Sequence, residues 1–115
     1  MKGKLRLKRA YEPAEGADGR RVLVDRIWPR GVSKDEAHID LWLKEVAPST
    51  ALRQWFGHEP GRWPQFRERY LQELKGNPAT EQLRQIMAEG PTTLVYGAKD
   101  TERNQAVVLA EFLQS

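Results

Sequence analysis

Two short segments, residues 25–34 and 99–104, are rich in charged side chains. They contain the residues best suited to bind a ligand or to catalyse a reaction. Asp25 and Asp100 are carboxylates that could act as a general base or orient a nucleophilic water. Cations accompany them, and the arginine guanidinium in particular is a planar fork that matches phosphate or carboxylate. We therefore predict a site for an anion, a phosphate-bearing or nucleotide-like small molecule that the protein either binds or transforms. The cations predicted to hold it are Arg26, Arg30, Lys34 and Lys99.

The run Trp28-Pro29-Arg30-Gly31 in the first segment predicts a shaped loop. Pro29 fixes its own φ and restricts Trp28, and Gly31 could let the backbone approach a ligand closely. Trp28 is thus a predicted ligand contact, although its indole could instead cover the core. No glycine-rich fingerprint of the dinucleotide or Walker type is present.

A dense aromatic stretch spans residues 55–63 and contains Trp55, Phe56, His58 and Trp63. Core packing is one use of such rings, and a stacking wall for a base or a sugar is another. His58 would join that wall as a group able to titrate near neutral pH, so it is also a predicted ligand contact.

The residue inventory excludes several kinds of site. The chain of 115 residues contains no cysteine, which excludes disulfides, thiolate zinc sites and a cysteine nucleophile. Two histidines cannot form a multi-histidine metal site by themselves, and no metal or cofactor is predicted. The N-terminus has no apolar signal-peptide core, and no stretch approaches the roughly 18 to 20 apolar residues of a membrane helix. A cytoplasmic protein without a membrane partner is expected.

The net charge of +3 is unevenly distributed. Residues 1–34 hold ten Lys and Arg and four Asp and Glu, giving +6, whereas the rest holds nine and twelve, giving −3. Because clustered cations attract phosphate, the basic first third suggests an alternative function as a nucleic-acid or protein-binding module. It also has a purely structural interpretation, since Lys and Arg keep exposed strand edges soluble. A homodimer formed through the aromatic helices is a third interpretation.

Three segments show the patterns of β-strands. Residues 4–11 alternate charged with apolar side chains, which is typical of an edge or near-edge strand, and residues 20–28 contain the apolar run of a central strand. Residues 92–96 are β-branched and aromatic. Strands followed by crossover helices favour a parallel sheet, whose carboxyl ends share one rim. Ligands of open α/β sheets bind at this rim, where the two charged segments would meet.

Capping signals and helical periodicity predict the helices. Ser33 and Glu36 form a capping box, and the apolar residues that follow, up to Val46, are spaced as on one helix face until Pro48 ends the helix. Further helices are predicted from Ser49 to Gly57, from Trp63 to Leu74, from Asn77 to Gly90, and after a cap at Asp100 or Thr101. We therefore predict an α/β fold, a single three-layer domain over residues 1–115 with a small, mostly parallel sheet flanked by about five helices.

Several runs of sequence together resemble one known family. The longest is Val24–Lys34 (VDRIWPRGVSK), and Leu41–Lys44, Trp55–His58 and Leu94–Asp100 follow it in the same order. On these motifs the chain resembles, over essentially its whole length, the YeaO-like family, the domain-of-unknown-function family numbered four hundred eighty-eight. The resemblance implies a small bacterial α/β protein, and it transfers no catalytic role because the family has no established activity.

The last motif of this chain departs from the pattern of that family. Similar members often have a His-Asn pair after the Lys-Asp motif, whereas this chain has Arg103-Asn104. The difference weakens any proposal of a histidine base at this place. Asn104 is still predicted as a polar ligand contact.

Overall fold

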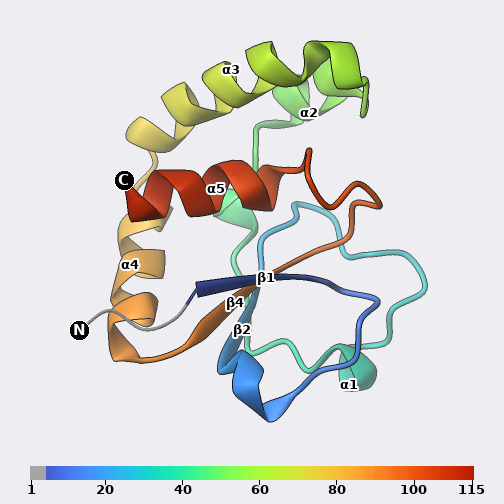
Figure 1. Cartoon of the computed structure of the whole chain (residues 1–115), viewed down its shortest axis with the longest axis vertical. Coiled ribbons are helices and arrows are strands. Elements are labelled where there is room, and N and C mark those ends of the chain that lie inside the picture. Colours follow the sequence, from blue (N-terminus) through green and yellow to red (C-terminus); the bar gives the residue numbers. More distant parts are fainter. Residues whose placement is uncertain (1–4) are drawn as a thin grey trace.

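A four-stranded parallel sheet forms the centre of the protein in the computed structural model, which describes residues 5–115 (Figure 1). The strands stand in the order β1-β4-β2-β3, and each neighbouring pair is parallel. The predicted α/β fold with a small parallel sheet is therefore confirmed. The strands are β1 (Leu5–Arg9), β2 (Arg20–Leu23), β3 (Leu41–Trp42) and β4 (Thr92–Tyr96).

Three strands lie where the sequence patterns predicted them, although β1 and β2 are shorter than the predicted segments. Residue 4 of the predicted first strand lies outside the described residues, and β1 occupies the sheet edge that its half-buried pattern predicted. β2 ends at Leu23, just before Asp25 and Arg26 interrupt the apolar run of residues 20–28. The Val24 N–H still donates to the Val95 carbonyl at 3.0 Å, but the Asp25 carbonyl accepts a hydrogen bond from the Trp42 indole instead of from a strand. The chain therefore leaves the sheet at Asp25.

Four helices cover one face of the sheet, and Figure 1 shows α2, α3 and α5 grouped above it with α4 at its side. The Ser49 hydroxyl accepts from the Leu52 N–H at 3.2 Å, and Gly57 ends that helix with a φ of 51°, both as predicted. Within residues 5–115, no helix has the length and apolar character needed to cross a membrane. The four are α2 (Thr50–Phe56), α3 (Trp63–Lys75), α4 (Ala79–Glu89) and α5 (Gln105–Gln114).

The helix predicted over residues 33–48 is wrong beyond its first turn. α1 (Lys34–Ala37) begins as predicted, because the Ser33 hydroxyl accepts from the Glu36 N–H at 3.1 Å. His38 then adopts a left-handed backbone conformation with a φ of 49°, which ends the helix. The apolar residues that follow have helical spacing but do not form a helix.

The open edge of β2 explains this outcome. The Asp40 N–H donates to the Arg21 carbonyl and the Leu43 N–H donates to the Leu23 carbonyl, both at 2.9 Å. A strand at this edge satisfies backbone groups of β2 that a helix would leave without partners. The segment therefore becomes β3, followed by a single 3-10 turn at Lys44–Val46.

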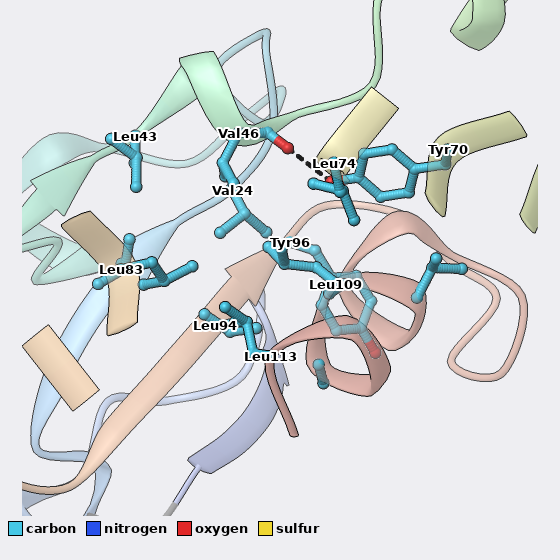
Figure 2. Packing of buried hydrophobic residues seen from close by; sticks show 14 of the residues in the cluster. Val24, Leu43, Val46, Tyr70, Leu74, Leu83, Leu94, Tyr96, Leu109 and Leu113 are labelled. Atoms are coloured by element: carbon cyan, nitrogen blue, oxygen red, sulfur yellow. Dashed lines mark hydrogen bonds between the residues drawn. The ribbon is translucent and has the colours of Figure 1, made fainter. Parts of the chain in front are cut away.

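Figure 2 shows the main core, which lies between the sheet and the four helices. Leu94 of β4 packs in one buried cluster with Leu109 and Leu113 of α5. Tyr70 of α3 is fully buried, and its hydroxyl donates to the Val46 carbonyl at 2.6 Å, the dashed line in Figure 2. A buried hydroxyl needs such a partner, so this bond fixes α3 against the turn that follows β3.

The opposite face of the sheet is covered by the segment between β2 and β3. Leu23 and Val95 are buried there, and Trp28 and Trp42 pack against them. The two indoles meet edge to face, with 5.4 Å between ring centroids, and the Trp28 N–H donates to the Val32 carbonyl at 2.6 Å. Trp28 therefore covers the core, the structural use considered for it. With the helices and the sheet, this segment makes the third layer.

Gly19 sets the start of β2 against the residue that precedes β4. Its φ is 65°, and a Cβ placed on it would lie 2.1 Å from the Pro91 carbonyl oxygen. Gly19→Ala is expected to lower the free energy of unfolding by about 3 kcal/mol or more, because the left-handed conformation and the clash add together. Urea denaturation measures this loss.

Gly16→Ala is the matched control. A Cβ on Gly16 meets no atom within 4 Å, so this variant should change the free energy of unfolding by less than about 1 kcal/mol. Equal losses in the two variants would show that the contact with Pro91 does not position β2.

Candidate functional site

A cavity of about 420 Å³ lies at the carboxyl ends of β1, β2 and β4. β2 and β4 are adjacent and parallel, so the polar segments that follow them emerge at the same rim. This convergence is the geometric condition on which the predicted site depends. The cavity is walled by Tyr11 after β1, by residues 25–30 after β2, by Gly97 and Ala98 after β4, and by residues from α2, α3 and α5.

Asp25 is the one carboxylate among residues 5–115 that lines this cavity. Its Oδ2 accepts a hydrogen bond from the Gly97 N–H at 2.9 Å, and its Oδ1 accepts one from the side-chain amide of Gln105. Gly97 directly follows β4 and Gln105 is the first residue of α5. The Asp25 carboxylate thus joins the exits of the two central strands to the start of the last helix.

Burial raises the pKa of Asp25 from 3.8 to about 6, because removal from water disfavours the charged form. The hydrogen bonds from Gly97 and Gln105 and the positive charge of Arg53 oppose this rise without cancelling it. In the part of the chain that the structure describes, no Lys, Arg or His nitrogen lies within 4.0 Å of the carboxylate. Such a group could exchange a proton near neutral pH, or it could receive an N–H donor of a ligand.

Gly97 is the point where the backbone must approach another group closely. A Cβ on Gly97 would lie 2.9 Å from Oδ2 of Asp25 and 3.4 Å from Cβ of Pro29. The approach to a ligand predicted at Gly31 stays a prediction. Gly31 has a φ of 79° in the turn that the Val32 N–H closes onto the Pro29 carbonyl at 3.4 Å, and a Cβ placed on it would meet no atom within 4 Å.

Three guanidinium groups line the cavity, from Arg26, Arg30 and Arg53. Arg26 donates from Nε to the Pro48 carbonyl at 3.2 Å and from Nη2 to the Ala47 carbonyl at 3.3 Å, so the chain before α2 holds its position. Within residues 5–115, none of the three has a carboxylate within 4.0 Å. Three positive charges without an ion-pair partner favour an anion at this place.

The aromatic stretch supplies both core and cavity wall. Phe56 and Phe66 stack with ring centroids 4.3 Å apart, and both line the cavity although they are buried. Trp63 packs beside this pair, with its centroid 5.7 Å from that of Phe66 and 6.0 Å from that of Phe56. His58 lines the same cavity from an exposed position, with its ring centroid 5.9 Å from that of Phe56. Phe56 and Phe66 therefore both pack in the core and form part of the cavity wall.

The structure brings most of the predicted site residues to one cavity. Those that line it are Asp25, Arg26, Trp28, Arg30, His58 and Asn104, and those that lie outside it are Lys34, Lys99 and Asp100. Among residues 5–115, no group of three or more His, Asp or Glu side chains is placed to hold a metal ion.

Asp100 is occupied by the turn that it begins. Its Oδ1 accepts from the backbone N–H of Glu102 at 2.9 Å and from that of Arg103 at 3.0 Å. These two bonds hold the pKa of Asp100 below its usual value. The predicted catalytic carboxylate at this position therefore has a structural use, and it does not line the cavity.

The predicted helix cap at Asp100 or Thr101 is wrong, because Asn104 caps α5. Its side-chain oxygen accepts from the Val107 N–H at 3.0 Å, and its amide donates to the Asp100 carbonyl at 2.9 Å. Asn104 is buried, with 2% of its surface exposed. Its position beside the cavity is thus fixed by the helix that it begins.

Sequence patterns did not indicate Tyr11, Arg53, Phe66 or Gln105 as residues of the site. Tyr11 donates its hydroxyl to the Arg30 carbonyl at 2.8 Å and so supports the loop after β2. Gln105 is adjacent to the predicted Asn104, which is the one sequence signal that could have found it. Arg53 carries no such signal, because a single arginine on a short helix is typical of any solvated helix face.

Part of the basic N-terminal third has a structural use. Asp18 is 1% exposed, and it pairs with Arg21 at 2.6 Å and with Lys8 at 3.2 Å. Lys2 and Lys4 lie outside the described residues. The cations available to a nucleic acid within residues 5–34 are therefore fewer than the sequence count suggests, and that alternative function stays a prediction.

Comparison with known proteins agrees with the predicted resemblance. The family model described as the inactive DUF488-N3 subclade matches residues 4–115. The chain is 46% identical over 112 residues to the uncharacterized protein YeaO of Escherichia coli (strain K12), which covers 96% of this chain and 97% of that protein. It is 42% identical over 110 residues to the uncharacterized protein Rv3073c of Mycobacterium tuberculosis (strain ATCC 25618 / H37Rv), covering 96% and 93%. No solved structure matches significantly.

The raised pKa of Asp25 gives the protein a specific pH dependence. The pKa is about 6 in the folded state and 3.8 without burial, so between these values the folded protein binds a proton that the unfolded chain does not. The free energy of unfolding therefore falls as the pH rises through this window. Asp25→Asn cannot ionise, and between pH 4.5 and pH 7.5 the wild type should lose about 2 kcal/mol of unfolding free energy relative to this variant. Urea denaturation at the two pH values measures the difference. A difference that does not change with pH would contradict the burial of a charged Asp25.

Proposed function

The chain belongs to the YeaO-like DUF488 family, and from this premise we propose that the protein binds a phosphate-bearing small molecule of the nucleotide kind in the cavity at the carboxyl ends of β2 and β4. The observation that carries the proposal is the set of three arginines in that cavity, Arg26, Arg30 and Arg53, which have no carboxylate within 4.0 Å among residues 5–115. Like charges held together without a partner repel one another, and a bound anion removes this repulsion.

Phosphate suits this cluster better than a simple halide or carboxylate. A guanidinium group binds two oxygens of one phosphate side by side, and three guanidiniums can share the three terminal oxygens. The buried rings of Phe56 and Phe66 and the exposed ring of His58 line the same cavity, so a flat ring would meet aromatic surface there. A ligand with a phosphate and an aromatic base would use both walls. The volume of about 420 Å³ falls within the range of pockets for small ligands.

Binding without turnover is the form of the proposal that the comparisons favour. The matching family model is described as an inactive subclade. Asp100, one of the two carboxylates predicted to do proton chemistry, lies outside the cavity and is bonded within its own turn. Asp25 then remains as a carboxylate whose hydrogen bonds can recognise a ligand as readily as move a proton.

Substitution of the cavity arginines tests the proposal. We expect nucleoside monophosphates to bind the wild type in isothermal titration calorimetry and to raise its melting temperature. Arg30→Ala and Arg53→Ala should each weaken this binding about tenfold or more, because each removes a charge-assisted hydrogen bond.

Lys99→Ala is the matched control, since it removes one positive charge from the loop after β4 but lies outside the cavity. It should bind the same nucleotides nearly as the wild type does. Equal weakening by Lys99→Ala would show a diffuse charge effect rather than a site, and the absence of any binding at millimolar nucleotide would refute the proposed function.

A further inference from the structure

The Asp25 carboxylate has acceptor capacity that the protein does not use. An ionised carboxylate offers about four lone-pair positions. Two are filled, one by the Gly97 N–H at 2.9 Å and one by the Gln105 amide. Both donors are neutral, and in the described part of the chain no cationic nitrogen lies within 4.0 Å of the carboxylate. The remaining positions are open to N–H groups of a molecule in the cavity that Asp25 lines.

The cavity arginines form no ion pair with Asp25, although the positive charge of Arg53 acts on it. Arg26 is directed to the carbonyls of Ala47 and Pro48, and none of the three cavity arginines reaches Asp25 within 4.0 Å in residues 5–115. Had an arginine paired with Asp25, the two charges would have satisfied each other and left little for a ligand. A ligand that uses both the carboxylate and the arginines must therefore carry N–H donors as well as an anionic group.

Part of the remaining wall is apolar and suits a flat ring. The buried rings of Phe56 and Phe66 line the cavity, and Pro29 packs near Gly97. Ile27 also lines the cavity while 58% exposed, which is high for an isoleucine. A bound aromatic ring would cover apolar surface that water now contacts.

We infer that the base end of the ligand is guanine, held by Asp25, while its phosphate lies at the cavity arginines. This inference rests on the proposed function and adds to it the identity of the base. Guanine carries a ring N–H and an amino group side by side on one edge, and the two oxygens of a carboxylate accept both bonds at once. Adenine has an acceptor nitrogen beside its amino group. A lone pair of Asp25 would face the lone pair of that nitrogen, and the two would repel each other. Hypoxanthine keeps the ring N–H but lacks the amino group.

The chemistry predicts an order of affinity that calorimetry can measure. Guanosine monophosphate should bind about tenfold or more tightly than adenosine monophosphate, as two matched hydrogen bonds on a base edge typically discriminate. Inosine monophosphate should lie between them. The phosphate is the same in all three, so the cavity arginines do not contribute to this order.

Asp25→Asn supplies the decisive variant. Asparagine presents one acceptor and one donor, which match the ring N–H and the neighbouring carbonyl of xanthine rather than the edge of guanine. The variant should lose the preference for guanosine monophosphate and should bind xanthosine monophosphate about tenfold more tightly than the wild type does. A fold defect would lower all affinities together and would not exchange one preference for another. Circular dichroism confirms that the variant is folded.

The outcomes separate the two proposals. If all nucleotides bind equally and Asp25→Asn leaves their affinities unchanged, the guanine inference is overturned while the proposed function stands. If adenosine monophosphate binds best, the assignment of the base is likewise wrong. If none of the four nucleotides binds, both proposals fail.

Discussion

Asp25 and Gly97 meet because β2 and β4 pair in parallel, and the walls of the cavity follow from this pairing. The register places Leu23 opposite Val95, and the Val24 N–H donates to the Val95 carbonyl at 3.0 Å. Two residues beyond the pair Leu23 and Val95, both chains have left the sheet, and the Asp25 carboxylate accepts from the Gly97 N–H. A shift of this register by one residue would exchange the two faces of the strand and separate these groups.

The pairing also explains why a carboxylate is half-buried at this rim. The backbone N–H of Gly97 has no strand partner beyond the end of β4, and the Asp25 carboxylate provides one. The absence of a Cβ on Gly97 leaves room for the carboxylate, because a Cβ would lie 2.9 Å from Oδ2. The protein thus places a partly desolvated acceptor in the cavity and accepts the unfavourable free energy of its burial, as functional sites commonly do.

The two groups of cations in the chain are used differently. Lys8 and Arg21 approach the buried Asp18 beneath the sheet, where their charges are compensated within the protein. The arginines around the cavity lack such compensation among residues 5–115, and Arg26 is held by backbone carbonyls rather than by a carboxylate. Net charge per segment could not distinguish these uses, because it counts compensated and uncompensated charges alike.

The sequence by itself determined the features that depend on neighbours along the chain. The strand at residues 92–96, the cap at Ser49 and the stop at Gly57 all follow from local backbone preferences. The convergence of two parallel strands at one rim followed from the order of strands and helices along the chain. Tertiary structure alone decided that residues 39–46 form a strand and a turn. Their apolar residues have helical spacing, but the segment hydrogen-bonds to the open edge of β2 instead of forming a helix. It also placed Arg53 at the cavity, from a helix whose position is set by packing. Both outcomes depend on contacts with residues that are distant in sequence. Hydrophobic periodicity reflects only the conformation of neighbouring residues, so it could not predict them.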